Sequence, residues 1–211
     1  MNRKLIFDTV RSLLGRGFRR EEVDLLDRAI DRALADSPPR LGALSERFES
    51  GGRGPGTVSP GAGDPGGVSY GIWQLSSRPG TVAAFHAAEG ARWSAEFGGA
   101  RPGSAEFTAA WQAIAGREAE AFAEAQQAFI ERSHYRPAVA AVRRQTGLDL
   151  DGGPAALRDA AWSVAVQHGA AARILAAAGA AADADLPRGD PGYDRRLVEA
   201  IYAERTAYVQ R

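Results

Sequence analysis

The chain has 211 residues, 45% of them hydrophobic, with 26 basic and 26 acidic side chains and no cysteine. This length and apolar content fit one soluble domain with at most a small appendage. The zero net charge argues against a dedicated nucleic-acid binder, and the lack of cysteine excludes a disulfide framework and thiol chemistry. We also expect no secretory signal and no membrane span, because charges interrupt every apolar run before about 18 residues.

Two amphipathic helices are predicted within residues 2–35. The first ends at Gly15, and the second has Glu21 and Glu22 in its first turn, where carboxylates complement the helix dipole. We interpret residues 1–36 as a helical hairpin, either packed on the main domain or serving as a docking or wall-binding module. The apolar residues at helical spacing are Ile6, Val10, Leu13, Leu14, Val23, Leu26, Ile30 and Ala33.

A glycine-rich loop is the most unusual part of the chain. Ser37-Pro38-Pro39 predicts a linker, since proline ends a helix and stiffens the connection, and the main domain spans residues 40–211. Residues 50–69 contain eight glycines and three prolines. A loop of this length is uncommon inside a compact domain and is often functional.

The remainder of the chain is predicted to be helical almost throughout. Residues 104–132 should form two helices with a break near Gly116, and the next helix has Pro137 near its first turn. The alanine-rich residues 154–178 should form a buried central helix and its neighbour. Asp190-Pro191 is predicted to start the terminal helix, with Asp as the N-cap and Pro at the first helical position.

A carboxylate precedes the glycine-rich loop. Glu49 follows Phe48 at the end of a short apolar helical pattern. A carboxylic acid whose pKa is raised by apolar surroundings can protonate the leaving oxygen of a glycosidic bond. Glu46, one helical turn earlier, is the rival acid, although it lacks the Ser-Gly that follows Glu49. The plainer interpretation of Glu49 is an exposed carboxylate at a helix end.

The same stretch resembles a known pattern. Glu49-Ser50, Val58-Ser59 and Gly71-Ile72-Trp73-Gln74-Leu75 stand in the order found in lysozyme-like glycan-cleaving enzymes, which include soluble lytic transglycosylases, goose-type lysozymes and chitosanases. The resemblance covers residues 40–178. It implies a mainly α, lysozyme-like α+β fold with a small β-hairpin beside the cleft. Residues 7–27 similarly resemble the leading segment of many phage endolysins.

The resemblance implies roles for two carboxylates. Glu49 corresponds to the general acid, and Asp64, inside the loop, is the candidate base that activates water. An inverting hydrolase holds two such carboxyl groups about 6.5–9.5 Å apart. If Asp64 does not face the cleft, Glu49 acts alone and the sugar's own 6-hydroxyl closes an anhydro ring, as in lytic transglycosylases. Asp64-Pro65-Gly66-Gly67 is equally ordinary turn chemistry.

Five further residues are candidates for substrate binding. Gln74 stands at the family's glutamine position, where the side chain lines the cleft. Tyr70 and Trp73 are candidates to stack on sugar faces, and Trp73 is equally a candidate core residue. Ser59 and Ser69 are expected to hydrogen-bond the loop backbone or a sugar.

A second segment carries a partial match. Ala165-Val166-Gln167-His168-Gly169-Ala170 stands where transglycosylases have Ala-Tyr-Asn-Ala-Gly, with Tyr replaced by Val, Asn by Gln and a histidine inserted. It is more similar to the Val-Gln-His-Gly of lysozyme-like modules in phage tails and type VI secretion spikes. Gln167 and His168 are expected to contact substrate or fix the loop, and the alternative for His168 is a buried, hydrogen-bonded side chain.

These features predict a monomeric, peptidoglycan-degrading muramidase of endolysin type that cleaves the MurNAc–GlcNAc bond without a cofactor. It would act in the periplasm or cell wall after release from the cytoplasm by a holin or an injection apparatus. A lytic transglycosylase or chitosanase-like glycosidase remains open. A zinc peptidase is disfavoured because His86, His134 and His168 lack metal-binding spacing. A non-catalytic cell-wall-binding or phage-tail structural module is the alternative of another class.

Overall fold

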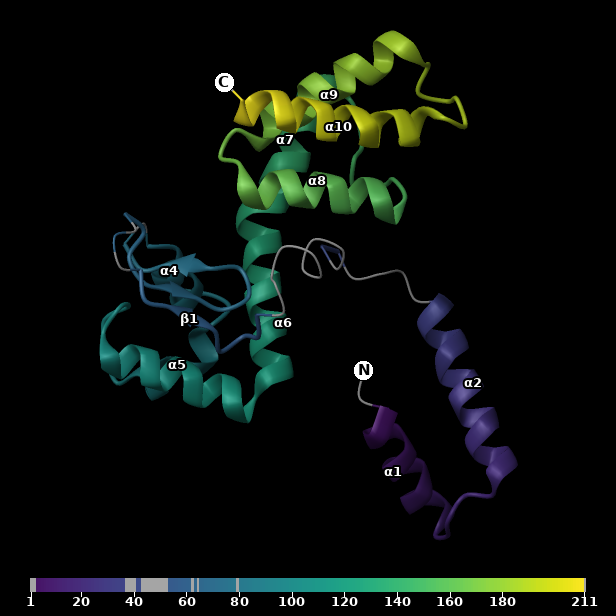
Figure 1. Cartoon of the computed structure of the whole chain (residues 1–211), viewed down its shortest axis with the longest axis vertical. Coiled ribbons are helices and arrows are strands. Elements are labelled where there is room, and N and C mark those ends of the chain that lie inside the picture. Colours follow the sequence, from purple (N-terminus) through teal and green to yellow (C-terminus); the bar gives the residue numbers. More distant parts are fainter. Residues whose placement is uncertain are drawn as a thin grey trace. The chain divides into compact units, whose positions relative to one another are not determined.

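The structure is a computed structural model that describes residues 3–36, 41–42, 53–61, 63, 65–78 and 80–210, with the backbone alone for 31–36. The chain divides into two compact units, Met1–Arg40 and Leu41–Arg211. The ribbon of each unit is mainly helical (Figure 1).

The first unit contains the predicted helical hairpin. Its helices are α1 (Arg3–Leu14) and α2 (Arg20–Asp36). Gly15 has a φ of 64°, a left-handed conformation that glycine adopts without a steric penalty, and its N–H donates to the Arg11 carbonyl at 3.1 Å. This glycine ends α1 where the sequence predicts. The rings of Phe7 and Phe18 meet edge to face with 5.5 Å between centroids.

The hairpin has little apolar core within itself. No residue of α1 is buried. Two short helices bury too little apolar surface to offset the conformational entropy lost on folding. Four leucines of the hairpin are exposed, and they are Leu5, Leu13, Leu14 and Leu25.

The second unit begins with a small antiparallel sheet. Its strands are β1 (Val58–Ser59), β2 (Ser69–Tyr70) and β3 (Leu75–Ser76), in the order β1-β2-β3. Tyr70 of the middle strand pairs with Val58 on one side and with Leu75 on the other. The prediction of a mainly α fold with a small β element is confirmed, and the β element has three strands where the sequence suggested a hairpin.

An aromatic core packs against this sheet. Trp111 is fully buried and lies 5.4 Å from Phe85 and 4.6 Å from Phe122, measured between ring centroids. Such aromatic pairs stabilise a core beyond the area that they bury. The helices that supply it are α4 (Thr81–Ala87), the 3₁₀ helix η1 (Ala91–Phe97), α5 (Ala105–Arg117) and α6 (Ala119–Ile130).

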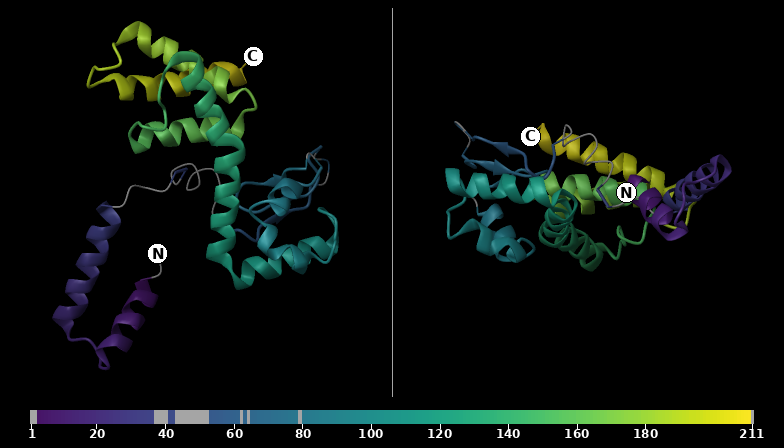
Figure 2. Two further views of the ribbon diagram at one scale, coloured as in Figure 1. Left: turned by 180° about the vertical axis from the view of Figure 1, so that it is seen from behind. Right: turned by 90° about the horizontal axis from the view of Figure 1, so that it is seen from below.

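A single long helical rod runs through the second unit. The helix α6 continues through the π-helical turn η2 (Glu131–Tyr135) into α7 (Arg136–Thr146), as Figure 2 shows. The predicted break near Gly116 is present, since α5 ends at Arg117. We did not predict that the helix containing Pro137 would continue directly from α6. The π-helical turn lies immediately before this proline and carries the chain past it.

Three further helices complete the unit beside α7 (Figure 1). They are α8 (Ala155–Gln167), α9 (Ala171–Asp185) and α10 (Tyr193–Val209), with α9 packed on both α7 and α10. The helix α8 is the most buried, as predicted for residues 154–178. The terminal helix begins at Tyr193, later than predicted, because Asp190 caps the preceding turn: its carboxylate accepts from the Gly192 N–H at 2.7 Å.

Candidate functional site

The two predicted catalytic carboxylates, Glu49 and Asp64, lie outside the described residues, as does Glu46. The structure describes both flanks of residues 43–52, the remaining predicted binding residues and the segment around Gln167 and His168.

The upstream flank of residues 43–52 is held by three buried side chains. Gln127 of α6 donates from its side-chain amide to the Leu41 carbonyl at 2.7 Å. The Gly42 N–H donates to the Asp159 carboxylate of α8, also at 2.7 Å. Gly42 lies directly against the Trp162 indole, because a Cβ atom at this position would be 2.5 Å from Nε1. Buried irregular backbone requires such partners, since an unpaired polar group away from water is costly.

The downstream flank is held by the neighbouring residue of α6. Gln126 is fully buried, and its side-chain amide donates to the Pro55 carbonyl at 3.0 Å. Its carbonyl oxygen accepts from the Ile72 N–H, also at 3.0 Å. The Trp111 indole N–H donates to the same Pro55 carbonyl at 2.8 Å. Gln126 and Gln127, which we call the glutamine clamp, therefore hold both flanks of the segment from one turn of one helix.

The residues of the motif Gly71-x-x-Gln74 make contacts within the protein itself. Gly71 has a φ of 76°, and a Cβ atom there would lie 2.1 Å from the Gln126 side-chain oxygen. Gln74 has a positive φ of 53°, and its side-chain amide donates to the Gly71 carbonyl at 3.0 Å. Its side-chain oxygen accepts from the Ser59 hydroxyl at 3.0 Å. Ser59 and Gln74 thus bind each other across the loop.

Two other predicted binding residues lie in the core. Tyr70 is fully buried, and its hydroxyl accepts from the Gly103 N–H at 3.0 Å and shares a hydrogen bond with Thr108 at 2.9 Å. Ser69 is 7% exposed. The predicted stacking of Tyr70 on a sugar does not fit this position, because its ring has no exposed face.

Trp73 is partly buried and packs against the core. Its ring meets Trp162 at 5.4 Å in an edge-to-face arrangement. Its indole N–H is buried and hydrogen-bonds none of the described groups. Trp73 therefore contributes to packing, and its stacking on a sugar stays a prediction.

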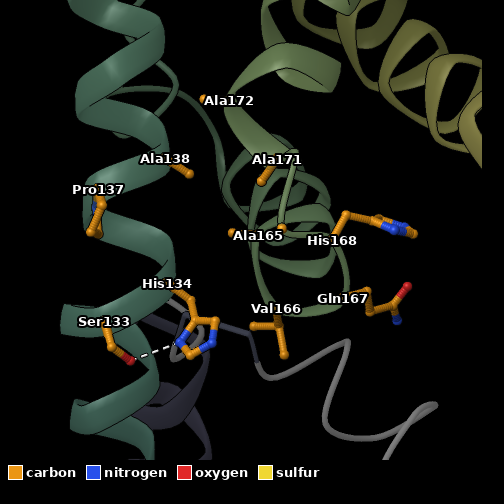
Figure 3. Close-up of a pocket in the computed structure, with 11 residues that line it drawn as sticks. Ser133, His134, Pro137, Ala138, Ala165, Val166, Gln167, His168, Ala171 and Ala172 are labelled. Atoms are coloured by element: carbon orange, nitrogen blue, oxygen red, sulfur yellow. Dashed lines mark hydrogen bonds between the residues drawn. The ribbon is translucent and has the colours of Figure 1, made fainter. Parts of the chain in front are cut away.

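A pocket of about 430 Å³ lies between the long helix and the junction of α8 with α9 (Figure 3). His134 and Val166 face each other across it, whereas the side chains of Gln167 and His168 point away from the long helix. Gln167 and His168 were predicted from the sequence to bind substrate. They line this pocket together with residues that the sequence analysis did not single out for binding. The lining residues are Ser133, His134, Pro137, Ala138, Ala165, Val166, Gln167, His168, Gly169, Ala171 and Ala172.

The π-helical turn places Ser133 and His134 in this wall. Pro137 has no N–H to give the Ser133 carbonyl, and its ring would press on that carbonyl in a regular α-helix. The wider turn before Pro137 accommodates both effects, and π-helical turns frequently occur at functional sites. The sequence signal that we overlooked is the proline inside an otherwise uninterrupted apolar helical pattern.

The two pocket histidines have different surroundings. Burial lowers the pKa of His134 from its ordinary value of 6.5, because desolvation disfavours the imidazolium form. The His168 ring meets the Tyr208 ring of α10 edge to face, with 5.4 Å between centroids. The Arg173 guanidinium carbon also lies over the Tyr208 ring, 5.6 Å from the ring centroid. The terminal helix therefore helps to position His168.

Two further features are absent from the part of the chain that the structure describes. No group of three or more His, Asp or Glu side chains that could hold a metal ion occurs there. Within the same residues, no helix is both long enough and apolar enough to cross a membrane.

The fold and the pocket define a mainly helical module with a concave, preformed site. Residues 41–211 match the family model described as type VI secretion system spike protein VgrG3-like, C-terminal, and the chain belongs to this family. The type VI secretion system spike protein VgrG3 of Vibrio cholerae serotype O1 is 40% identical over 135 residues. That match covers 64% of this chain and 13% of the relative, so the chain spans a small part of that protein's length.

This assignment corrects the function expected from the sequence. The predicted family of lysozyme-like glycan hydrolases, the muramidase activity and the glycoside hydrolase class are wrong on this comparison, which points to a type VI secretion spike. The roles expected of Glu49 and Asp64 depended on the lysozyme-like resemblance. Among the resemblances drawn from the sequence, that of residues 165–170 is the one that pointed to secretion spikes.

The glutamine clamp makes a prediction about stability. Replacing Gln126 with Ala removes the partner of the Ile72 N–H, leaves the Pro55 carbonyl with the Trp111 indole alone and opens a cavity. We therefore expect a loss of about 2–4 kcal/mol in unfolding free energy. Urea denaturation of the full chain measures it. Gln145→Ala, on the exposed face of α7, is the matched control and should change the value by less than about 0.5 kcal/mol. Equal effects of the two variants would contradict the clamp.

The contact between Gly42 and Trp162 makes a second prediction. Gly42→Ala introduces both a strained φ of 76° and a clash with the indole, whereas Gly99→Ala introduces a φ of 80° in open space. We expect Gly99→Ala to cost about 1 kcal/mol and Gly42→Ala about 2 kcal/mol more. Thermal unfolding of the two variants side by side tests this difference. Indistinguishable midpoints would show that Gly42 does not pack on Trp162.

Proposed function

We propose that residues 41–211 form a module carried by a type VI secretion spike. The observation that carries this proposal is the agreement between two boundaries. The family match begins at residue 41, and the second compact unit begins at Leu41. A domain boundary usually lies where few contacts cross, so a unit that ends there can be appended to another protein. This proposal develops the structural-module alternative that the sequence left open.

The internal construction of the unit supports this role. Its aromatic and alanine-rich cores are closed, with Trp111 and Trp162 fully buried. The glutamine clamp satisfies the backbone of its loop from within the unit. A module of this kind needs no neighbouring domain to complete its core, which suits a passenger at the end of a larger spike. Of the two delivery routes considered from the sequence, this proposal favours the injection apparatus.

Export tests the proposal directly. An epitope-tagged full chain is expressed in its own host, and culture supernatants are compared between the parent strain and a strain that lacks the type VI contractile sheath. We expect the chain in the supernatant of the parent only, with a cytosolic protein absent from both as the lysis control. Equal amounts in the two supernatants would overturn the proposal.

We further propose the helical hairpin of the first unit as the element that docks onto the spike. The hairpin lies outside the residues that match the family model. Leu13 is 82% exposed and Leu25 is 64% exposed, so each helix of the hairpin offers a large apolar side chain to a partner.

The docking role has its own test. We expect the double variant Leu13→Ser, Leu25→Ser to lose most of the spike protein that co-purifies with the tagged chain. Asp24→Ser, Arg28→Ser, at exposed polar positions of α2, is the matched control and should retain it. Unchanged recovery with the leucine variant would exclude hairpin docking and leave the module proposal standing.

A further inference from the structure

The hydrogen bonds of Ser133 fix the tautomer of His134. The Ser133 hydroxyl donates to the Phe129 carbonyl at 2.5 Å, and its oxygen lies 2.7 Å from His134 Nδ1. A carbonyl oxygen can only accept, so the single hydroxyl proton of Ser133 is committed to Phe129. The bond to Nδ1 must then run from the imidazole to the serine. A neutral His134 therefore carries its proton on Nδ1.

The other ring nitrogen consequently bears a lone pair. His134 Nε2 forms no hydrogen bond with any group in the described part of the chain, and the ring faces the pocket (Figure 3). We propose that the pocket is a binding site for a neutral ligand, which donates a hydrogen bond from an amide N–H or a hydroxyl to His134 Nε2. Ser133 is the positioning residue, since it acts only through His134. The proposal does not depend on the spike assignment.

The charges of the other lining side chains indicate which ligand charge the pocket favours. Among the described residues that line the pocket there is no Asp, Glu, Lys or Arg, and His168 is the other titratable side chain there. The nearest charges on the same turn are engaged elsewhere: Glu131 pairs with Arg136, and Arg132 pairs with Glu89. A charged ligand would lose its hydration without gaining a counter-charge, so a neutral one is favoured.

The apolar side chains near His134 indicate which groups the ligand has next to its N–H or O–H donor. Val166 faces the imidazole, and the lining also includes the small apolar side chains of Ala165 and Ala171. Small apolar groups beside one acceptor suit a compact ligand with a methyl or methylene group next to its N–H or O–H. Small-molecule sites likewise combine apolar side chains with a small number of placed polar groups.

The tautomer is tested first, by long-range proton–nitrogen NMR correlations of the imidazole rings in the full chain. We expect a protonated Nδ1 and an unprotonated Nε2 for His134 at pH 8. Ser133→Ala should abolish this preference, and Ser133→Thr, which retains a hydroxyl, should restore it. A wild-type ring protonated on Nε2 would overturn the proposal.

Binding is tested with a matched pair of probes, followed by chemical shifts of His134. N-methylacetamide has one N–H, whereas N,N-dimethylacetamide has none. We expect saturable shifts with the first probe and about fivefold weaker binding of the second. Propanediol tests whether a hydroxyl serves equally well, and acetate and ammonium should not bind. Equal binding of both amides would contradict the role of Nε2. His134→Phe should remove the preference between them.

The pH dependence follows from the same acceptor. Protonation turns Nε2 into a donor, and burial lowers the pKa of His134, so the acceptor persists to a lower pH than on an exposed histidine. We expect probe affinity to be highest at pH 8 and to fall as the pH decreases through the lowered pKa. His168→Gln should leave this profile in place. Affinity that increases on acidification would overturn the proposal.

Discussion

The second unit depends on hydrogen bonds that run from one helix turn to loop backbone. Gln126 and Gln127 are adjacent on α6, yet they bind Pro55 and Leu41, which flank the segment 43–52 on either side. Adjacent residues on a helix point about 100° apart, so one pair can reach two chain segments. Together with Trp111, which also binds Pro55, and Asp159, which binds Gly42, the two glutamines tie the loop flanks to the helices.

The same long helix builds one wall of the pocket. Its π-helical turn presents Ser133 and His134, while the junction of α8 with α9 presents Val166 from the opposite side. Trp162 of α8 packs against both Trp73 and Tyr135, which joins the sheet, the long helix and α8 through one indole ring. The geometry of the pocket is therefore coupled to the packing of the core.

The motif that suggested a glycan hydrolase has a structural explanation. Gly71 is required because Gln126 occupies the space of a Cβ atom, and Gln74 binds the Gly71 carbonyl and Ser59. A sequence shows the order of the residues in a motif. It does not show whether a side chain of that motif faces a ligand or its own loop. Substrate binding by Gln167 and His168 stays a prediction, and the pocket that they line also contains His134, whose position in the sequence shows no relation to them.

The sequence by itself determined the local structure. Apolar periodicity and single glycines such as Gly15 and Gly147 set the helices and their ends, because backbone conformation and burial of one face depend on neighbours along the chain. The tertiary structure alone decided the glutamine clamp, the burial of Tyr70 and the tautomer of His134. Each of these depends on a hydrogen bond or contact whose geometry arises only when the helices and the loop have packed together.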